Sequence, residues 1–237
     1  MTDRRDHPVA VSADALAASW ARTEDAPHGA LVVVGQEISP RCRGGRLWTP
    51  DPEDTLALSL VVRPTLPQSD ADILWLAAGQ ATVEAIDVVG GGRGTSKWPD
   101  LVVTDDGRTL AAVTVSTQLG PGGLRSAVIT VRVDLAVAAL TPGVRAELVE
   151  VLQERVLGRV ADAEDDAAGL AGRCLGRSAL SGKLAKVRLL PHGMARGRVQ
   201  GFAPTGALLL GASAQISEAV PVDAVAAVDV VDDPAHE

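Results

Sequence analysis

The chain has 237 residues, 46 % of them hydrophobic, which is enough for one large domain or for a medium and a small one. Its formal net charge of −8 disfavours a general polyanion binder. One Phe, four Trp and no Tyr argue against a base-stacking surface, so no nucleic acid partner is expected.

The sequence also predicts the location of the protein and the state of its cysteines. The segment 1–9 is charged and lacks the apolar core of a signal peptide, and no apolar run reaches membrane-spanning length. We therefore expect a cytoplasmic protein without a membrane partner. Cys42 and Cys174 lie far apart without metal-ligand spacing, so no metal site is expected. Two cysteines could form a disulfide, but two free thiols are the expectation in a reducing compartment.

The hydrophobic pattern predicts alternating helices and strands in the first three quarters of the chain. The predicted elements are helix 11–26, strand 30–34, strand 55–63, helix 70–87, strands 98–104, 109–117 and 125–135, and helix 142–166. Ser12 and Asp70 are the expected N-caps of the first two helices. Hairpin sequences at 105–107 and 120–123 predict antiparallel strands.

From Ser178 onward the sequence contains only short strands and turns, which favours a small β-barrel. The expected strands are 184–190, 196–202, 207–210, 219–222 and 225–231, and the acidic tail 232–237 is expected to fray. The predicted fold is α+β: a mostly antiparallel central sheet with helices packed on one face, followed by the barrel. We expect a first domain at 1–177 and a second at 178–237.

A basic loop is the first motif of chemical interest. The sequence Arg41-Cys42-Arg43-Gly44-Gly45-Arg46-Leu47-Trp48 places three arginines and two glycines within eight residues of an acidic protein. Glycines let backbone N–H groups approach an anion, and arginines donate in pairs to phosphate or carboxylate. When the loop is considered alone, a solvated basic loop explains this sequence slightly better than an anion-binding site does.

The second motif is Lys97-Trp98-Pro99-Asp100, whose lysine could hold a phosphate and whose aspartate could hold a ribose or Mg²⁺. Alone, it is more simply the entry to a strand. The glycines at 90–94 match no phosphate-binding fingerprint, so they indicate a flexible connection. Glu37, Asp105 and Asp106 could form a carboxylate set, although the two aspartates are better explained by a hairpin turn.

Together and in this order, the two motifs resemble those of biotin protein ligases. That family carries a G-R-G-R-x-G-R-x-W loop, an L-x-x-S-L strand, K-W-P-N-D-L, a K-L-A-G-I strand, a G-x-N element and an SH3-like barrel. The corresponding segments here are 40–48, 56–60, 97–101, 109–113, 130–134 and 183–190. The resemblance extends from about 11 to 231 and implies a class II synthetase-like fold, shared with lipoate ligases. No DNA-binding winged helix precedes it, so we expect the non-repressor type.

The resemblance implies an ATP-dependent ligase that forms biotinyl-5′-adenylate and passes biotin to a lysine of a biotin carboxyl carrier domain. Biotin, ATP and Mg²⁺ would be its small molecules, and a homodimer joined through sheet edges would be in keeping with the family. The catalytic residues implied are Arg43, Lys97 and Arg108. The binding residues implied are Ser12, Arg41, Arg43, Gly45, Arg46, Trp48, Lys97, Trp98, Asp100 and Thr109.

Several residues depart from the family pattern, mainly on the side that binds biotin. Thr109 replaces the lysine of K-L-A-G-I, with Arg108 as a neighbouring substitute, and Ala112 replaces its glycine. Arg132 stands in the G-x-N counterpart, where the family has small residues. A catalytically impaired relative that acts as a binding or regulatory module is therefore a second hypothesis. A ligase for lipoate or octanoate is a third.

Overall fold

The computed structural model describes residues 3–213 and 216–231. Seven strands form a central sheet in the order β1-β2-β3-β7-β6-β5-β4. These strands are β1 (Arg4–Ala10), β2 (Ala30–Glu37), β3 (Thr55–Val62), β4 (Thr95–Lys97), β5 (Leu101–Val103), β6 (Thr109–Gly120) and β7 (Gly123–Asp134). All neighbouring pairs are antiparallel except β1 and β2, which run parallel, so the mostly antiparallel sheet is confirmed.

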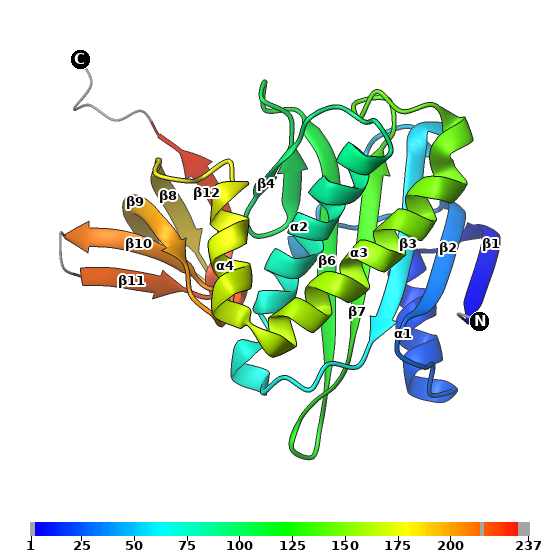
Figure 1. Ribbon diagram of the computed structural model, residues 1–237, viewed down its shortest axis with the longest axis horizontal. Coiled ribbons are helices and arrows are strands. Elements are labelled where there is room, and N and C mark those ends of the chain that lie inside the picture. Colours follow the sequence, from blue (N-terminus) through cyan, green and yellow to red (C-terminus); the bar gives the residue numbers. More distant parts are fainter. Residues whose placement is uncertain (1–2, 214–215, 232–237) are drawn as a thin grey trace.

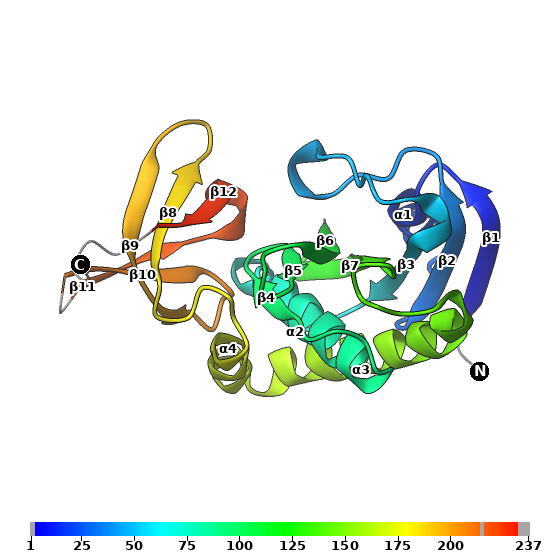
Figure 2. The ribbon, with the colours of Figure 1, turned by 90° about the horizontal axis from the view of Figure 1, so that it is seen from above.

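Helices cover both faces of this sheet, which corrects the expectation of a single covered face (Figures 1 and 2). The helices are α1 (Ala13–Thr23), α2 (Ile73–Val88), α3 (Arg145–Asp165) and α4 (Ala167–Gly176). Side chains alternate along a strand. Leu60 and Ile129 accordingly join the large core under α2 and α3, whereas Val61 and Val128 pack against α1.

A second sheet of five strands follows α4, in the order β11-β10-β9-β8-β12, and the barrel-like C-terminal unit is thereby confirmed. Its strands are β8 (Leu184–Leu189), β9 (Met194–Phe202), β10 (Leu208–Ser213), β11 (Ile216–Val220) and β12 (Val225–Val230). All its neighbouring strands are antiparallel. The predicted boundary between 177 and 178 falls in the connection from α4 to β8.

Hydrogen bonds join the C-terminal sheet to the preceding part of the chain. The indole N–H of Trp98 donates to the Gly206 carbonyl at 3.1 Å, and the Asp72 carboxylate accepts from the backbone N–H of Val222 at 2.8 Å. At the outer edge of β4, the backbone of Ser96 bonds to the backbone of Arg177 and Ala179. These contacts fix the C-terminal sheet beside one end of the central sheet, where Figure 2 shows it.

Some local predictions were wrong. Asp70 lies in a short 3₁₀ turn, and α2 begins after Asp72, whose side chain makes no capping bond. Of the predicted strand 98–104, only Leu101–Val103 is a strand, β5; residues 98–100 form a turn, and β4 lies before the predicted range. Strand β1 and helix α4 were not predicted at all. Ser12 does cap α1, and the predicted tail 232–237 lies outside the described residues. No helix of the described chain is long and apolar enough to cross a bilayer.

Candidate functional site

The site lies on the sheet face that α1 covers in part. The connection from β2 to β3 contains the basic loop, residues 41–48, and passes over this face toward the C-terminal sheet (Figure 2). Arg41 and Leu47 form an isolated antiparallel bridge, and Cys42 and Arg46 share a backbone hydrogen bond of 2.7 Å. Gly44 and Gly45 have φ values of 66° and 76°, a region that suits glycine, so the turn requires them.

Trp48 anchors the end of the basic loop. Its buried ring packs with Cys42 and Ala112, and its indole N–H donates to the Thr55 hydroxyl at 3.1 Å. Burial raises the pKa of the Cys42 thiol, against the opposing effect of Arg132 and Arg46. Ala112 therefore supports the loop through packing, at the position where the family pattern has glycine.

Arg43 and Arg46 extend from the loop in two directions. The Arg43 guanidinium donates to the carbonyl of Val222, at 2.6 Å, in the short turn before β12, and to that of Val225, the first residue of β12. Burial lowers the pKa of Arg43, but its guanidinium remains charged because an arginine pKa is far above neutrality. Arg46 pairs with the buried carboxylate of Asp100. Burial raises the pKa of Asp100, and the two arginines oppose that rise.

Between the loop, the end of β4 and the C-terminal sheet lies a cavity of about 290 Å³. Its charged lining consists of Arg43, Arg46, Lys97, Arg188, Asp100 and Asp229. Four cations against two carboxylates leave a formal excess of two positive charges in a protein whose net charge is −8. Trp98 and Leu101 add apolar surface. A positive cavity with some apolar lining suits a ligand that carries both phosphate and an apolar group.

A buried ionic network occupies the sheet face beside the loop. Arg132 of β7 is fully buried, and its guanidinium donates to both oxygens of Glu37, at 2.6 and 2.8 Å, and to Asp14 at 2.9 Å. A fourth bond, of 2.9 Å, reaches the Arg41 carbonyl. Burial alone would lower the pKa of Arg132, but its bonds to Glu37 and Asp14 raise it overall. Arg132 thus ties together the basic loop, β2 and α1.

The predicted site residues fall into two groups. Arg43, Arg46, Lys97, Trp98 and Asp100 meet at the cavity. Ser12 is buried at the α1 N-terminus, where its hydroxyl accepts from the Ala15 N–H, and Arg41 donates to the Gly45 carbonyl.

Arg108 and Thr109 do not line the cavity. Arg108 is exposed on the β5–β6 hairpin, where it pairs with Asp106, and Thr109 begins β6. Asp106 belongs to that hairpin and Glu37 to the Arg132 network, so the proposed carboxylate set is not assembled.

Sequence reasoning did not single out Arg188 and Asp229, which come from β8 and β12 of the C-terminal sheet. Arg188 lies in the segment 183–190 that resembles the start of the family's barrel, but nothing in that pattern marks Arg188 or Asp229 as a binding residue, so only their position in space identifies them. Arg132 was recognised as a large residue at a small-residue position, but its ion pairs were not predicted.

No protein-family model matches the sequence. The bifunctional ligase/repressors BirA of Bacillus spizizenii and Bacillus subtilis are each 28 % identical to it over 111 residues, which is 47 % of this chain. That match spans about a third of the length of these curated relatives, 34 %.

Among solved structures, the biotin protein ligase of Aquifex aeolicus, in complex with biotin and ATP, has a TM-score of 0.75 at 15 % identity. The match covers 98 % of this chain and 100 % of that one. A biotin protein ligase-like protein of unknown function from Silicibacter sp. TM1040 has a TM-score of 0.70 at 14 % identity, with 94 % and 95 % covered. At these identities the likeness shows the fold alone.

Proposed function

We propose that this chain, a divergent member of the biotin protein ligase family, is an ATP-dependent ligase that activates a carboxylic acid and transfers it to a protein lysine. The observation that carries the proposal is the positive cavity beneath the basic loop, lined by Arg43, Arg46, Lys97 and Arg188. Biotin is the first acid to test, because the similar ligase of Aquifex aeolicus has been solved in complex with biotin and ATP.

The proposed reaction has two steps. An oxygen of the acid's carboxylate attacks the α-phosphorus of ATP, and pyrophosphate leaves with the electrons of the broken P–O bond. The amine of the acceptor lysine then attacks the acyl carbon, loses a proton and expels AMP. By resemblance, the acceptor is a biotin carboxyl carrier domain.

The first step brings a carboxylate against a triphosphate, so cations must offset their repulsion. Lys97 and Arg46 are the proposed phosphate contacts, and Trp98 and Leu101 offer apolar surface to the base. Arg43 is proposed to hold the loop over the cavity through its bonds to the C-terminal sheet, which would shield a hydrolysis-prone adenylate from water. Within the described residues, no group of three or more His, Cys, Asp or Glu could hold a metal, so Mg²⁺ would arrive bound to the phosphates.

A specific observation favours a second candidate, a catalytically impaired module that binds nucleotide without activating biotin. Resemblance places small residues of the biotin side where Arg132 stands, and the guanidinium of Arg132 is held there by Glu37 and Asp14. A neutral ring that entered this space would have to displace a paired, buried charge, at a cost of several kcal/mol, about 3–5.

Acid-dependent ATP–pyrophosphate exchange tests both candidates without requiring a carrier protein. Biotin, lipoate and octanoate are offered in turn to the purified, folded protein. Exchange with one acid, lost in Lys97→Ala, supports the ligase and names its substrate class. No exchange with any acid, in a protein that still binds ATP, contradicts the ligase and leaves the binding module.

A further inference from the structure

The segment 167–217 differs in charge from the rest of the chain. It contains seven Lys or Arg residues and no Asp or Glu, in a protein whose formal net charge is −8. Strands β8 and β9 form a hairpin within this segment. Five of the seven cations lie on these strands or next to them, namely Lys183, Lys186, Arg188, Arg196 and Arg198. Positive charge is therefore concentrated on one pair of strands.

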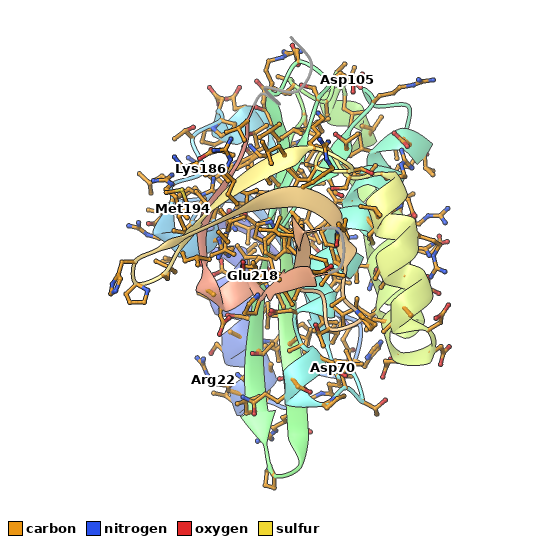
Figure 3. The ribbon with its side chains drawn as sticks, turned by 90° about the vertical axis from the view of Figure 1, so that its left-hand side faces the viewer. Arg22, Asp70, Asp105, Lys186, Met194 and Glu218 are labelled. Atoms are coloured by element: carbon orange, nitrogen blue, oxygen red, sulfur yellow. The ribbon has the colours of Figure 1, made fainter. Side chains whose placement is uncertain are left out.

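The cations of the two strands share one face. Side chains alternate between the faces of a strand, and the residues between these cations are buried in the core, namely Ala185, Val187, Ala195 and Val199. Lys186 is directly opposite Arg196 in register, and Arg188 is opposite Met194. Figure 3 views the molecule from the C-terminal sheet, with Lys186 and Met194 labelled. We call this cationic side of β8 and β9 the outer face of the hairpin.

Lys186 and Arg196 form a cross-strand pair of like charge. Within residues 3–213 and 216–231, neither side chain makes an ion pair or a hydrogen bond, although Asp229 of β12 is opposite Lys186. Like charges directly opposite each other on antiparallel strands destabilise the sheet. An anionic surface that contacts both cations would offset their repulsion.

The end of the same hairpin is apolar and exposed. The side chains of Leu190 and Met194 have exposed fractions of 54 % and 58 %, and only residues 191–193 separate them in the chain. Figure 2 shows this hairpin extending beyond the other strands of the C-terminal sheet. The hairpin thus combines two exposed apolar side chains near its end with a row of cations behind them.

We propose that the outer face of the hairpin binds the surface of a lipid bilayer that contains anionic lipids. Leu190 and Met194 enter the headgroup region, and Lys186 and Arg196 contact the lipid phosphates. The inference is independent of the proposed function, since it concerns a surface and not the cavity. It replaces the expectation that the protein has no membrane partner.

The chemistry of the hairpin favours a lipid surface over two other polyanions. Single-stranded nucleic acid is held largely by aromatic side chains that stack on its bases, and residues 184–201 include no Phe, Trp or Tyr. A stable protein interface buries about 800 Å² on each partner, far more than two apolar side chains provide. A bilayer needs no matching shape, because apolar side chains can enter between its headgroups.

The first test is co-sedimentation of the full chain with vesicles of phosphatidylcholine alone and with vesicles in which about a third of the lipid is phosphatidylglycerol. We expect binding to the anionic vesicles, binding about tenfold weaker or less to the neutral ones, and release at high salt. The double variant Lys186→Ala with Arg196→Ala is expected to bind anionic vesicles about tenfold more weakly. Its control, Arg22→Ala with Arg93→Ala, removes the same charge from exposed positions outside the C-terminal sheet and is expected to bind as the wild type does.

Met194→Ser tests the apolar end of the hairpin. It is expected to weaken binding to anionic vesicles about threefold or more, because less apolar surface enters the headgroup region. Leu119→Ser is the matched control, since Leu119 is 53 % exposed on the β6–β7 hairpin, and it is expected to leave binding unchanged. Urea unfolding checks that every variant is as stable as the wild type.

The inference is overturned if the wild type does not sediment with anionic vesicles, and an acidic protein would then be the partner to seek. Equal losses in the two double variants would also overturn it, because they would show a response to net charge alone. Equal losses in Met194→Ser and Leu119→Ser would contradict entry of the hairpin into the bilayer. No acid or nucleotide is added, so none of these results depends on whether the chain is a ligase.

Discussion

At the scale of single residues, Arg132 has the largest structural consequence for the candidate site. Its side chain is fully buried, and Glu37 and Asp14 balance its charge. Arg132→Met would leave Glu37 buried without its cation, so we expect the free energy of unfolding to fall by about 3–5 kcal/mol. Urea denaturation followed by circular dichroism measures it.

The double variant Arg132→Met with Glu37→Gln is the control for that prediction. It removes the unpaired charge, and the amide oxygen that replaces the carboxylate can still accept from the Ala13 N–H, which Glu37 binds at 2.7 Å in the native chain. We therefore expect the double variant to be more stable than Arg132→Met alone. Equal destabilisation in both would show that the ion pair contributes little.

The network also shows where sequence reasoning stops at this scale. The partners of Arg132 lie 95 and 118 positions away in the chain, so no local pattern could identify them. The sequence alone showed that Arg132 does not fit the family's biotin-binding pattern, because it is a large charged residue where the family has small ones. What it contacts depends on the register of β7 against β3 and on the position of α1.

At the scale of elements, the basic loop is held at both ends and at its tip. Pro40 and Trp48 join its ends through a backbone bond of 3.0 Å, and Arg43 fastens its tip to the C-terminal sheet. Arg43→Ala is expected to release the tip and to speed tryptic cleavage after Arg46, because proteolysis follows local opening. Timed digestion with mass spectrometry measures the rate.

Arg108→Ala is the matched control for the loop, since it removes an exposed arginine from a hairpin that does not contact the C-terminal sheet through that side chain. It should leave cleavage after Arg46 unchanged. Cleavage that is equally fast in the wild type and in Arg43→Ala would show that the contact of Arg43 with the C-terminal sheet does not hold the loop.

Most elements were predictable because their hydrophobic patterns are strong. The pair β6 and β7 and the five short strands of the C-terminal sheet were expected near their observed bounds. Strand β1 was missed because Arg4–Ala10 contains four charged or histidine residues and a proline, features that an edge strand tolerates. Helix α4 was missed because most of its residues are small, and its main partner, α2, is remote in sequence.

At the scale of the whole molecule, Gly206 decides how closely the two sheets approach. Its φ is +98°, and an added Cβ would lie 2.2 Å from the carbonyl carbon of Asp72, at the start of α2. Gly206→Ala should therefore push the C-terminal sheet away and disturb the bond from Trp98. We expect a loss of about 2 kcal/mol or more in the free energy of unfolding, measured in urea.

Gly182→Ala is the control for Gly206→Ala, because it separates the effect of backbone strain from that of a steric clash. Gly182 has a φ of +66°, but no atom lies within 4 Å of its added Cβ. We expect it to cost only the strain, about 1 kcal/mol. If the two variants were destabilised equally, the close contact between Gly206 and Asp72 would not be what fixes the sheets together.

Both candidate functions share one claim, that the cavity between the basic loop and the C-terminal sheet binds a nucleotide. The most direct test is calorimetric titration of ATP into the wild type and into Lys97→Ala, with Lys186→Ala as a control outside the cavity. We predict saturable binding to the wild type, binding weakened about tenfold or more by Lys97→Ala, and no change with Lys186→Ala. No binding to the wild type, or full affinity in Lys97→Ala, would contradict the account.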